Sequence, residues 1–239
     1  MQLEGACALV TGAGRGIGRA TALALGRHGV RVTAVARSRG ELDSLVAEIK
    51  GTGGTAQAFP GDVRERATCE GAVAAAVAAH GGLQILVNNA GVAKHGPLAQ
   101  MSDEDFAATF DTNLGAPFRL TRAALPHLAR QGGHVFMISS LAGQNPISGL
   151  AAYCASKAAL DQLSRCLMLE VRQQRVKITT IAPGSVDTGF GASSGLAPSG
   201  GEWKLSSDDI ALAIVDLLRS RDDAHLSRVE MRPLRPPKS

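Results

Sequence analysis

The chain has 239 residues, of which 45% are apolar and only 3% aromatic, and it carries a formal net charge of +4. A chain of this length can bury a sizeable core, so we expect residues 1–239 to form a single α/β domain. Its basic residues are scattered rather than gathered with aromatic side chains, which argues against a nucleic-acid partner. The apolar stretch near the start breaks at Gly12 and follows no basic segment, so neither a signal peptide nor a membrane partner is expected.

The four cysteines, Cys7, Cys69, Cys154 and Cys166, form no Cys-x-x-Cys pair and have no histidine at metal-ligand spacing. This pattern is typical of reduced thiols rather than of disulfides or metal ligands. We therefore expect a cytoplasmic protein without a metal site.

Short aliphatic runs alternate with longer Ala-rich stretches along the chain. The runs predict strands at Ala6–Thr11, Arg31–Ala36, Ala56–Pro60, Ile85–Asn88, His134–Ser139, Lys177–Ile181 and Arg228–Arg232. Helices are predicted at 17–29, 39–51, 64–80, 103–130, 151–174 and 207–219, with N-caps at Ser102 and at either Ser206 or Ser207. Alternating strands and helices imply right-handed crossovers and a sheet covered on both faces. The sequence thus predicts a doubly wound Rossmann fold with a seven-stranded, mostly parallel sheet.

The first predicted strand runs into a glycine-rich turn at which a helix begins. Glycines there let the backbone approach a pyrophosphate, and the free N–H groups of the helix start attract its charge. The spacing is Gly-x-x-x-Gly-x-Gly, with Ile17 where the more familiar dinucleotide fingerprint has its third glycine. A purely structural tight turn is the alternative. The expected phosphate-binding residues are Gly12, Gly14, Arg15, Gly16, Ile17 and Gly18.

The second predicted strand bears on the choice of dinucleotide. NAD-preferring folds place an acidic residue near the end of this strand to bind the ribose 2′-hydroxyl, whereas here Arg37 follows the strand and the first carboxylate is Glu41. Arg37 and Arg15 could hold a 2′-phosphate through charge-assisted hydrogen bonds. We expect NADP(H) as the cofactor, the alternative being that both arginines are solvated surface charges.

Polar residues follow the next two predicted strands. Asp62-Val63 comes after the third strand, where an Asp is often only a helix cap. Asn88-Asn89-Ala90-Gly91 comes after the fourth, where two amides and a glycine can line the cofactor cleft or simply form a turn.

Tyr153 and Lys157 lie four residues apart in a predicted helix, and Ser140 closes the strand before it. The four-residue spacing places the phenol and the ammonium on one helix face. A neighbouring cation favours the phenolate form of a tyrosine, which makes it a usable acid or base near neutral pH. The motif alone is common by chance, but Tyr153 is the only tyrosine of the chain.

In combination these residues resemble the short-chain dehydrogenase/reductase family over nearly the whole chain. The markers occur in that family's order: Thr11 to Gly18, Asp62, Asn88 to Gly91, Asn113, Ser140, Tyr153 with Lys157, then Pro183-Gly184 and Thr188. Such a set is specific because its members recur together and in this order.

The resemblance implies a catalytic tetrad of Asn113, Ser140, Tyr153 and Lys157. Tyr153 would be the general acid in reduction, and Ser140 would hydrogen-bond the substrate carbonyl. Lys157 would lower the Tyr153 pKa and bind the nicotinamide ribose, while Asn113 would hold a water that relays protons to Lys157. The implied and inferred cofactor contacts beyond the glycine turn are Arg37, Asp62, Val63, Asn89, Ala90, Gly91, Tyr153, Lys157, Pro183, Gly184, Val186 and Thr188.

Two segments bear on the substrate. Residues 189–205, rich in Gly, Ser and Pro, are expected to form a substrate-side loop, with Trp203 either near the substrate mouth or in a simple packing role. The chain closes on 229–237, which departs from the Val-Asp-Gly-Gly-like ending of many 3-oxoacyl-thioester reductases of that family. The sequence thus gives no support to a 3-oxoacyl-thioester substrate.

The leading hypothesis is an NADP(H)-dependent oxidoreductase that reduces a small-molecule carbonyl to an alcohol, or the reverse, by hydride transfer with Tyr153 as general acid/base. The alternatives are a catalytically inactive dinucleotide-sensing protein of the same fold, or an epimerase or dehydratase with a tightly held cofactor. The resemblance also implies a homo-oligomer, a dimer or tetramer, formed through the predicted helices at 103–130 and 151–174.

Overall fold

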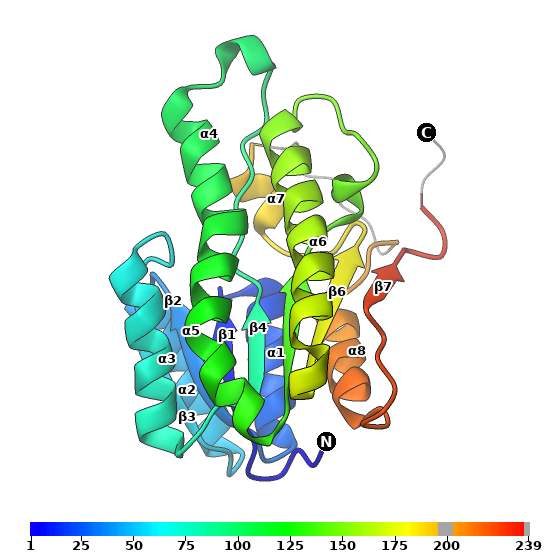
Figure 1. Cartoon of the computed structure of the whole chain (residues 1–239). Coiled ribbons are helices and arrows are strands. Elements are labelled where there is room, and N and C mark those ends of the chain that lie inside the picture. The colour runs from blue at the N-terminus through cyan, green and yellow to red at the C-terminus, as the bar shows by residue number, and fades with distance from the viewer. Residues whose placement is uncertain (196–202, 237–239) are drawn as a thin grey trace.

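Seven parallel strands form one sheet in the order β3-β2-β1-β4-β5-β6-β7 within residues 1–195 and 203–236, which the computed structural model describes (Figure 1). The direction of winding reverses between β1 and β4, so a crevice is expected at the carboxyl ends of these two strands. This arrangement confirms the predicted doubly wound α/β fold. The strands are β1 Cys7–Thr11, β2 Arg31–Ala36, β3 Ala56–Pro60, β4 Ile85–Asn88, β5 Gly133–Ile138, β6 Val176–Pro183 and β7 Arg228–Met231.

Helices cover both faces of the sheet (Figure 1). On one face, Leu25 of α1 and Ile214 of α8 pack in the same cluster as Ala8 of β1. On the other face, Leu120 of α5 packs in the same cluster as Leu9 of β1, because successive strand residues point to opposite sides. The helices are α1 Gly16–Arg27, α2 Arg39–Gly51, α3 Arg66–His80, α4 Asp103–Phe110, α5 Ala116–Gln131, α6 Ala151–Val171, α7 Phe190–Ser193 and α8 Ser207–Arg219.

The stretch predicted as one helix at 103–130 is divided by a π-helical turn, η2, at Asp111–Gly115. A π turn inserts an extra residue per turn and rotates the following helix face. Hydrophobic periodicity does not reveal such an insertion, so the prediction of a uniform helix was wrong here. The turn matters for function because it contains Asn113.

Two of the expected caps are present. The Ser102 hydroxyl accepts a hydrogen bond from the Asp105 backbone N–H at 3.1 Å at the start of α4. Ser206, rather than Ser207, caps α8 and forms a reciprocal capping box with Asp209. The helix predicted at 151–174 is α-helical to Val171 and then tightens into a 3₁₀ turn. None of the described helices combines the length and the apolar character that a bilayer-spanning helix needs.

Candidate active site

A cleft of about 1430 Å³ runs along the carboxyl edge of the sheet. It is lined by the segments that follow β1 to β6 and, on the far side, by residues that follow β7. Among the residues predicted to bind the cofactor, Gly18 is the one that does not line this cleft. Of the predicted catalytic residues, Ser140, Tyr153 and Lys157 line it, and Asn113 lies behind its wall.

The glycine turn after β1 is shaped by close packing against the loop after β4. Gly12 has φ +63°, and a Cβ there would lie 2.8 Å from the Asn89 side-chain nitrogen. A Cβ on Gly18 would overlap the Gly12 carbonyl oxygen, so this glycine serves the packing of α1 on the turn rather than the cleft. Helix α1 carries no acidic residue in its first turn, which leaves its N-terminal N–H groups available for an anion.

Thr11 fastens the two loops together, a role that the sequence analysis did not assign. Its hydroxyl accepts hydrogen bonds from the backbone N–H groups of Asn89 at 3.0 Å and Ala90 at 3.1 Å. The Asn89 side chain in turn donates to the Thr11 carbonyl at 2.8 Å. Asn88 points away from the cleft, where its amide donates to the Thr121 hydroxyl at 3.1 Å. The two adjacent asparagines therefore brace opposite sides of one loop.

The end of the cleft next to β2 contains charges of both signs. Arg15 and Arg37 line it, and a Cβ built on Gly189 would lie 3.9 Å from the Arg15 guanidinium. The Glu41 carboxylate also faces the cleft and occupies the space that a side chain at Gly14 would need. This end of the cleft therefore holds the cations of Arg15 and Arg37 and, close to the glycine turn, the carboxylate of Glu41.

Asp62 lies at the same end and does not cap a helix. Its carboxylate accepts hydrogen bonds from the Arg64 backbone N–H at 3.0 Å and from the Arg64 guanidinium at 2.7 Å. The Arg64 contact, opposed by partial burial, lowers the pKa of Asp62. The N-cap position of α3 belongs to Glu65. Asp62 is therefore an ionised wall residue of the cleft, next to Val63.

Tyr153 and Lys157 project from α6 into the middle of the cleft. The Lys157 ammonium lies 5.7 Å from the centroid of the Tyr153 ring and donates to the Ile138 carbonyl at 2.8 Å. Burial lowers the pKa of Lys157 to about 8, although the Asp161 carboxylate opposes that shift. The two side chains share one helix face, as their spacing predicts.

Burial raises the pKa of Tyr153 to about 12, against the effect of a side-chain hydrogen bond with Ser140. The lowering of this pKa expected from Lys157 is therefore not the net outcome in this geometry. The reason is that the phenol is desolvated while the ammonium is directed at the Ile138 carbonyl. Ser140 sits two residues beyond the end of β5, where its hydroxyl also accepts from the Ala142 backbone N–H at 3.1 Å and caps the 3₁₀ turn η3, Leu141–Gly143.

Asn113 is fully buried in the π-helical turn. Its side-chain oxygen accepts from the Val92 N–H at 2.8 Å, and its nitrogen donates to the Val92 carbonyl at 2.9 Å and to the Ser156 hydroxyl at 3.0 Å. The side chain thus clamps the loop after β4 to α6. The expected role in holding a water stays a prediction, and both polar side-chain atoms already have partners.

The far end of the cleft is formed by the segment after β6. Pro183, Gly184, Val186 and Thr188 line it, as does Trp203. The expected loop at 189–205 contains the short helix α7, and its residues 196–202 lie outside the described part of the chain.

Several lining residues were not anticipated as site residues. The Phe190 ring lies 5.8 Å from the Tyr153 ring, and Lys94, Ile147, Lys204 and Arg232 also border the cleft. The sequence offers no local signal for Phe190 or Ile147. Arg232 belongs to a group of basic residues near the end of the chain, and that pattern alone predicts no site.

Comparisons with known proteins place this geometry among oxidoreductases. The family model described as short chain dehydrogenase matches residues 6–197. The 2,3-dihydro-2,3-dihydroxybenzoate dehydrogenase of Bacillus subtilis is 34% identical over 208 residues, which cover 87% of this chain and 76% of that protein. The probable oxidoreductase EphD of Mycobacterium tuberculosis is 36% identical over 236 residues, 95% of this chain but only 40% of that longer protein.

A solved structure extends the likeness to nearly the full chain. A metagenomic short-chain oxidoreductase, crystallised in complex with NADP, superimposes with a TM-score of 0.86 at 36% identity and covers 98% of this chain and 99% of that one. The fold, the order of the motifs and the family model agree. The chain belongs to the short-chain dehydrogenase family of oxidoreductases.

Proposed function

We propose that the protein is an NADP(H)-dependent oxidoreductase that interconverts a small-molecule carbonyl compound and an alcohol. The observation that carries the proposal is the convergence of Ser140, Tyr153 and Lys157 on the cleft that the glycine turn also borders. A proton-transfer group and a dinucleotide cradle in one cleft are the two requirements of a hydride-transfer enzyme.

The cleft fits a dinucleotide on stereochemical grounds. Gly12 and Gly14 contribute no side chains of their own to the turn, and α1 carries no acidic residue in its first turn, so its N–H groups face the cleft with Glu41 as the nearby carboxylate. NADPH, when bound, supplies the hydride, while the protein supplies binding, orientation and protons. Pro183, Gly184, Val186 and Thr188 would border its nicotinamide half, and Asp62 and Val63 its adenine half.

Proton transfer falls to the three side chains in the middle of the cleft. Ser140 would donate a hydrogen bond to the substrate oxygen as negative charge develops there. Tyr153 would give its phenolic proton to that oxygen in reduction and take it back in oxidation. Lys157 would hold the ribose and stabilise the phenolate that Tyr153 becomes after it gives up its proton. Asn113 would keep the loop after β4 in place through its bonds to Val92.

The preference for NADP(H) rests on Arg15 and Arg37, which line the adenine end where no acidic residue directly follows β2. The NADP complex of the metagenomic relative supports this assignment. The Glu41 carboxylate opposes a phosphate at this end, because it faces the glycine turn.

We further propose that residues 1–239 act as one cytoplasmic domain and assemble into a homo-oligomer. Large apolar side chains are exposed on the helices that the resemblance singles out: Phe106 on α4, Phe118 on α5 and Leu169 on α6. A mass measured by light scattering checks the assembly, and a monomer at micromolar concentration would contradict it.

The cofactor assignment is tested by titration with NADPH and NADH, read by fluorescence of Trp203, the chain's only tryptophan and a residue of the cleft wall. NADPH is expected to bind about tenfold or more tightly than NADH, and Arg37→Asp to remove that preference. Arg39→Asp is the matched control, because Arg39 pairs with Asp43 on the surface of α2. Equal binding of the two cofactors by the unaltered protein contradicts the assignment.

The chemistry is tested by turnover with NADPH against aldehydes, ketones, quinones and 3-oxoacyl thioesters. Tyr153→Phe should abolish turnover and keep NADPH binding, because it removes one hydroxyl from an otherwise unchanged ring. Full activity in Tyr153→Phe would refute the proposed mechanism. Tight NADPH binding without turnover of any carbonyl would instead favour the dinucleotide-sensing alternative.

A further inference from the structure

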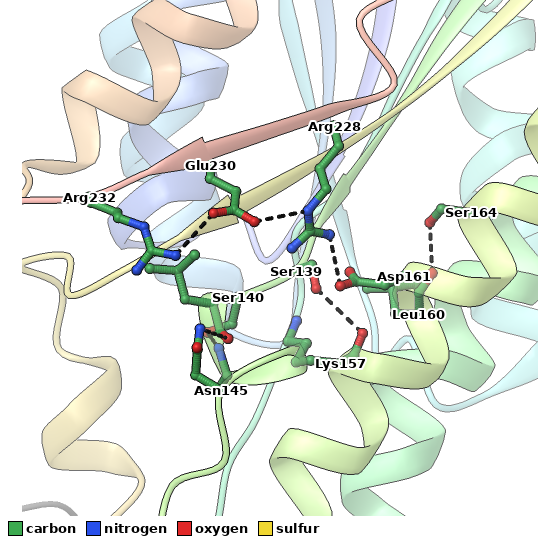
Figure 2. A network of polar contacts seen from close by, with 12 residues as sticks. Ser139, Ser140, Asn145, Lys157, Leu160, Asp161, Ser164, Arg228, Glu230 and Arg232 are labelled. Carbon is green, nitrogen blue, oxygen red and sulfur yellow. Dashed lines mark hydrogen bonds and ion pairs between the residues drawn. The ribbon is translucent and has the colours of Figure 1, made fainter.

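A row of charged side chains on β7 and the residue after it connects the last strand of the sheet with the helix and the loop that carry Tyr153, Lys157 and Ser140 (Figure 2). Arg228 donates to the Asp161 carboxylate at 2.8 Å and to the Glu230 carboxylate at 3.2 Å. Arg232, on the cleft wall, donates to the other Glu230 oxygen at 3.0 Å. We call Arg228, Glu230 and Arg232 the β7 charge row.

Asp161 is the member of this network that lies inside the protein. Its side chain is 8% exposed, and the Arg228 side chain is 20% exposed. One of its oxygens is bound by Arg228, while the other is buried and has no hydrogen-bond partner among the described residues. Asp161 also follows Lys157 by four residues on α6, so the carboxylate and the ammonium occupy one helix face. A buried carboxylate in this position acts on Lys157 through its charge.

The loop after Ser140 packs directly against this part of α6. A Cβ on Gly143 would lie 3.1 Å from the Asp161 carboxylate and 3.1 Å from the Lys157 backbone carbon. The next residue, Gln144, bonds to the β7 charge row: with its amide oriented so that both atoms have partners, it donates to Glu230 and accepts from Arg228, each at 3.0 Å. The charge row therefore contacts both the segment of Ser140 and the helix of Lys157.

We propose that Asp161 is a positioning residue that keeps Lys157 a cation in the cleft, and that Arg228 moderates this effect while it ties the Ser140 loop to β7 through Gln144. The inference rests on the proposed function, in which the Lys157 ammonium supports proton transfer by Tyr153. It assigns a function to a pair of residues 67 positions apart in the sequence.

The charged and titratable groups that bear on Lys157 have opposing signs. On α6 itself these are Asp161 and the phenol of Tyr153. Strand β7 contributes Arg228, which forms ion pairs with Asp161 and with Glu230. The elements on the other sides present neutral groups, the Ile138 carbonyl of β5 and the Asn113 amide of η2, among the described residues.

Two variants break the same ion pair and should move the titration of Lys157 in opposite directions. Asp161→Asn removes the anion that favours the ammonium, so the Lys157 midpoint should fall by about half a pH unit or more. Arg228→Gln removes the cation that offsets Asp161, so the midpoint should rise by a similar amount. Loss of packing or of the salt bridge alone cannot produce shifts of opposite sign.

The measurement is an NMR pH titration of ¹³C,¹⁵N-lysine-labelled full chain without added ligand. The chain has only six lysines, and the Lys157 signal is identified by its loss in Lys157→Met. Arg228→Lys, which keeps the cation, should restore the midpoint of the unaltered protein. Unchanged midpoints, or shifts of the same sign in both variants, would overturn the proposal.

Two features keep the test decisive. If Asp161→Asn fails to fold, the comparison of Arg228→Gln with Arg228→Lys still tests the proposal, since only Arg228→Gln removes the charge. The titration needs no substrate, so its outcome is separate from that of the Tyr153→Phe turnover assay. Where a carbonyl substrate is found, the alkaline limb of kcat/KM should move with the Lys157 midpoint in each variant.

Discussion

The Nζ atom of Lys157 donates a 2.8 Å hydrogen bond to the carbonyl oxygen of Ile138, the residue that ends β5. The bond fixes the ammonium at the base of the cleft, where Lys157 is only 4% exposed. Burial lowers its pKa to about 8, which means that the folded protein holds this charge at a cost. A costly charge at a site of proposed chemistry is the expected exchange of stability for function.

Lys157→Met should therefore reduce turnover by about 100-fold or more and at the same time stabilise the fold. The folded pKa of about 8 lies below the 10.5 of an ordinary lysine, so the unfolded chain binds more protons between these values and the stability of the unaltered protein rises with pH there. Between pH 7 and 9 this rise amounts to about 1 kcal/mol. Urea unfolding at both pH values should show the advantage of Lys157→Met shrinking by that amount.

The control for this comparison is Lys50→Met, at the exposed end of α2, which should show no such pH-dependent difference. A Lys157→Met protein that is less stable than the unaltered chain at pH 7, with a gap independent of pH, would contradict the cost assigned to the buried ammonium.

The buried side chain of His134 should make the stability of the fold sensitive to acid. Its ring is buried in β5, stacked on Phe136 at 4.0 Å and bonded to the Thr179 hydroxyl at 2.8 Å. Burial, reinforced by the nearby Lys177 ammonium, lowers its pKa to about 3. The unfolded chain, with a histidine pKa near 6.5, takes up a proton as the pH falls, so the stability present above pH 6.5 is lost progressively toward pH 3.

His134→Gln keeps a donor for Thr179 and removes this titration. Between pH 7 and 5 the unaltered protein should lose about 2 kcal/mol more unfolding free energy than His134→Gln. The exposed His95 gives the matched variant, His95→Gln, which should lose as much as the unaltered chain. Parallel losses in all three proteins would show that His134 does not govern the acid limb.

Helices and strands whose ends are set by local sequence signals could be predicted from the sequence. Strand β2 and helix α2 lie where predicted, because the apolar run ends at Ala36 and Ser38 provides the cap for Glu41. The glycine turn and the Tyr153 motif were equally readable, since their chemistry depends on short spacings.

Features that arise from tertiary contacts could not be predicted from the sequence. The π turn around Asn113 is stabilised by bonds to Val92 and Ser156, and no periodicity encodes it. The direction in which the Tyr153 pKa shifts depends on the burial of the phenol, and burial cannot be predicted from a local motif. The ion pair between Asp161 and Arg228 joins residues 67 positions apart, and neither residue belongs to a local motif.

Asn113→Ala should destabilise the fold by about 2–4 kcal/mol, since it leaves the partly buried N–H and carbonyl of Val92 without their partner. Activity should fall together with stability, because the loop after β4 borders the cleft. Thermal unfolding with turnover measures both. Asn145→Ala removes an exposed amide whose one side-chain bond within the described part of the chain goes to the Leu141 carbonyl, and it should cost less than about 1 kcal/mol. Similar losses in the two variants would contradict the clamp role of Asn113.

Glu41→Gln should strengthen the preference for NADPH over NADH, by about threefold to tenfold, because it removes the carboxylate that faces the glycine turn. Competitive fluorescence titrations of the two cofactors give the ratio. Glu48→Gln lies on the same helix but pairs with Arg19 away from the cleft, so its ratio should match that of the unaltered protein. A decrease in NADPH preference on Glu41→Gln would mean that Glu41 assists binding rather than opposing it.

Two glycine substitutions separate packing from backbone propensity. Gly18→Ala would press a methyl group against the Gly12 carbonyl oxygen, which is backbone and cannot swing aside, so it should cost about 1–3 kcal/mol. The displaced turn should also bind NADPH more weakly. Gly40→Ala places its methyl group in open space within α2 and should stabilise the helix by about 0.5–1 kcal/mol without changing NADPH affinity. If Gly18→Ala left both stability and NADPH affinity unchanged, the close approach of α1 to the turn would not be what positions the phosphate-binding backbone.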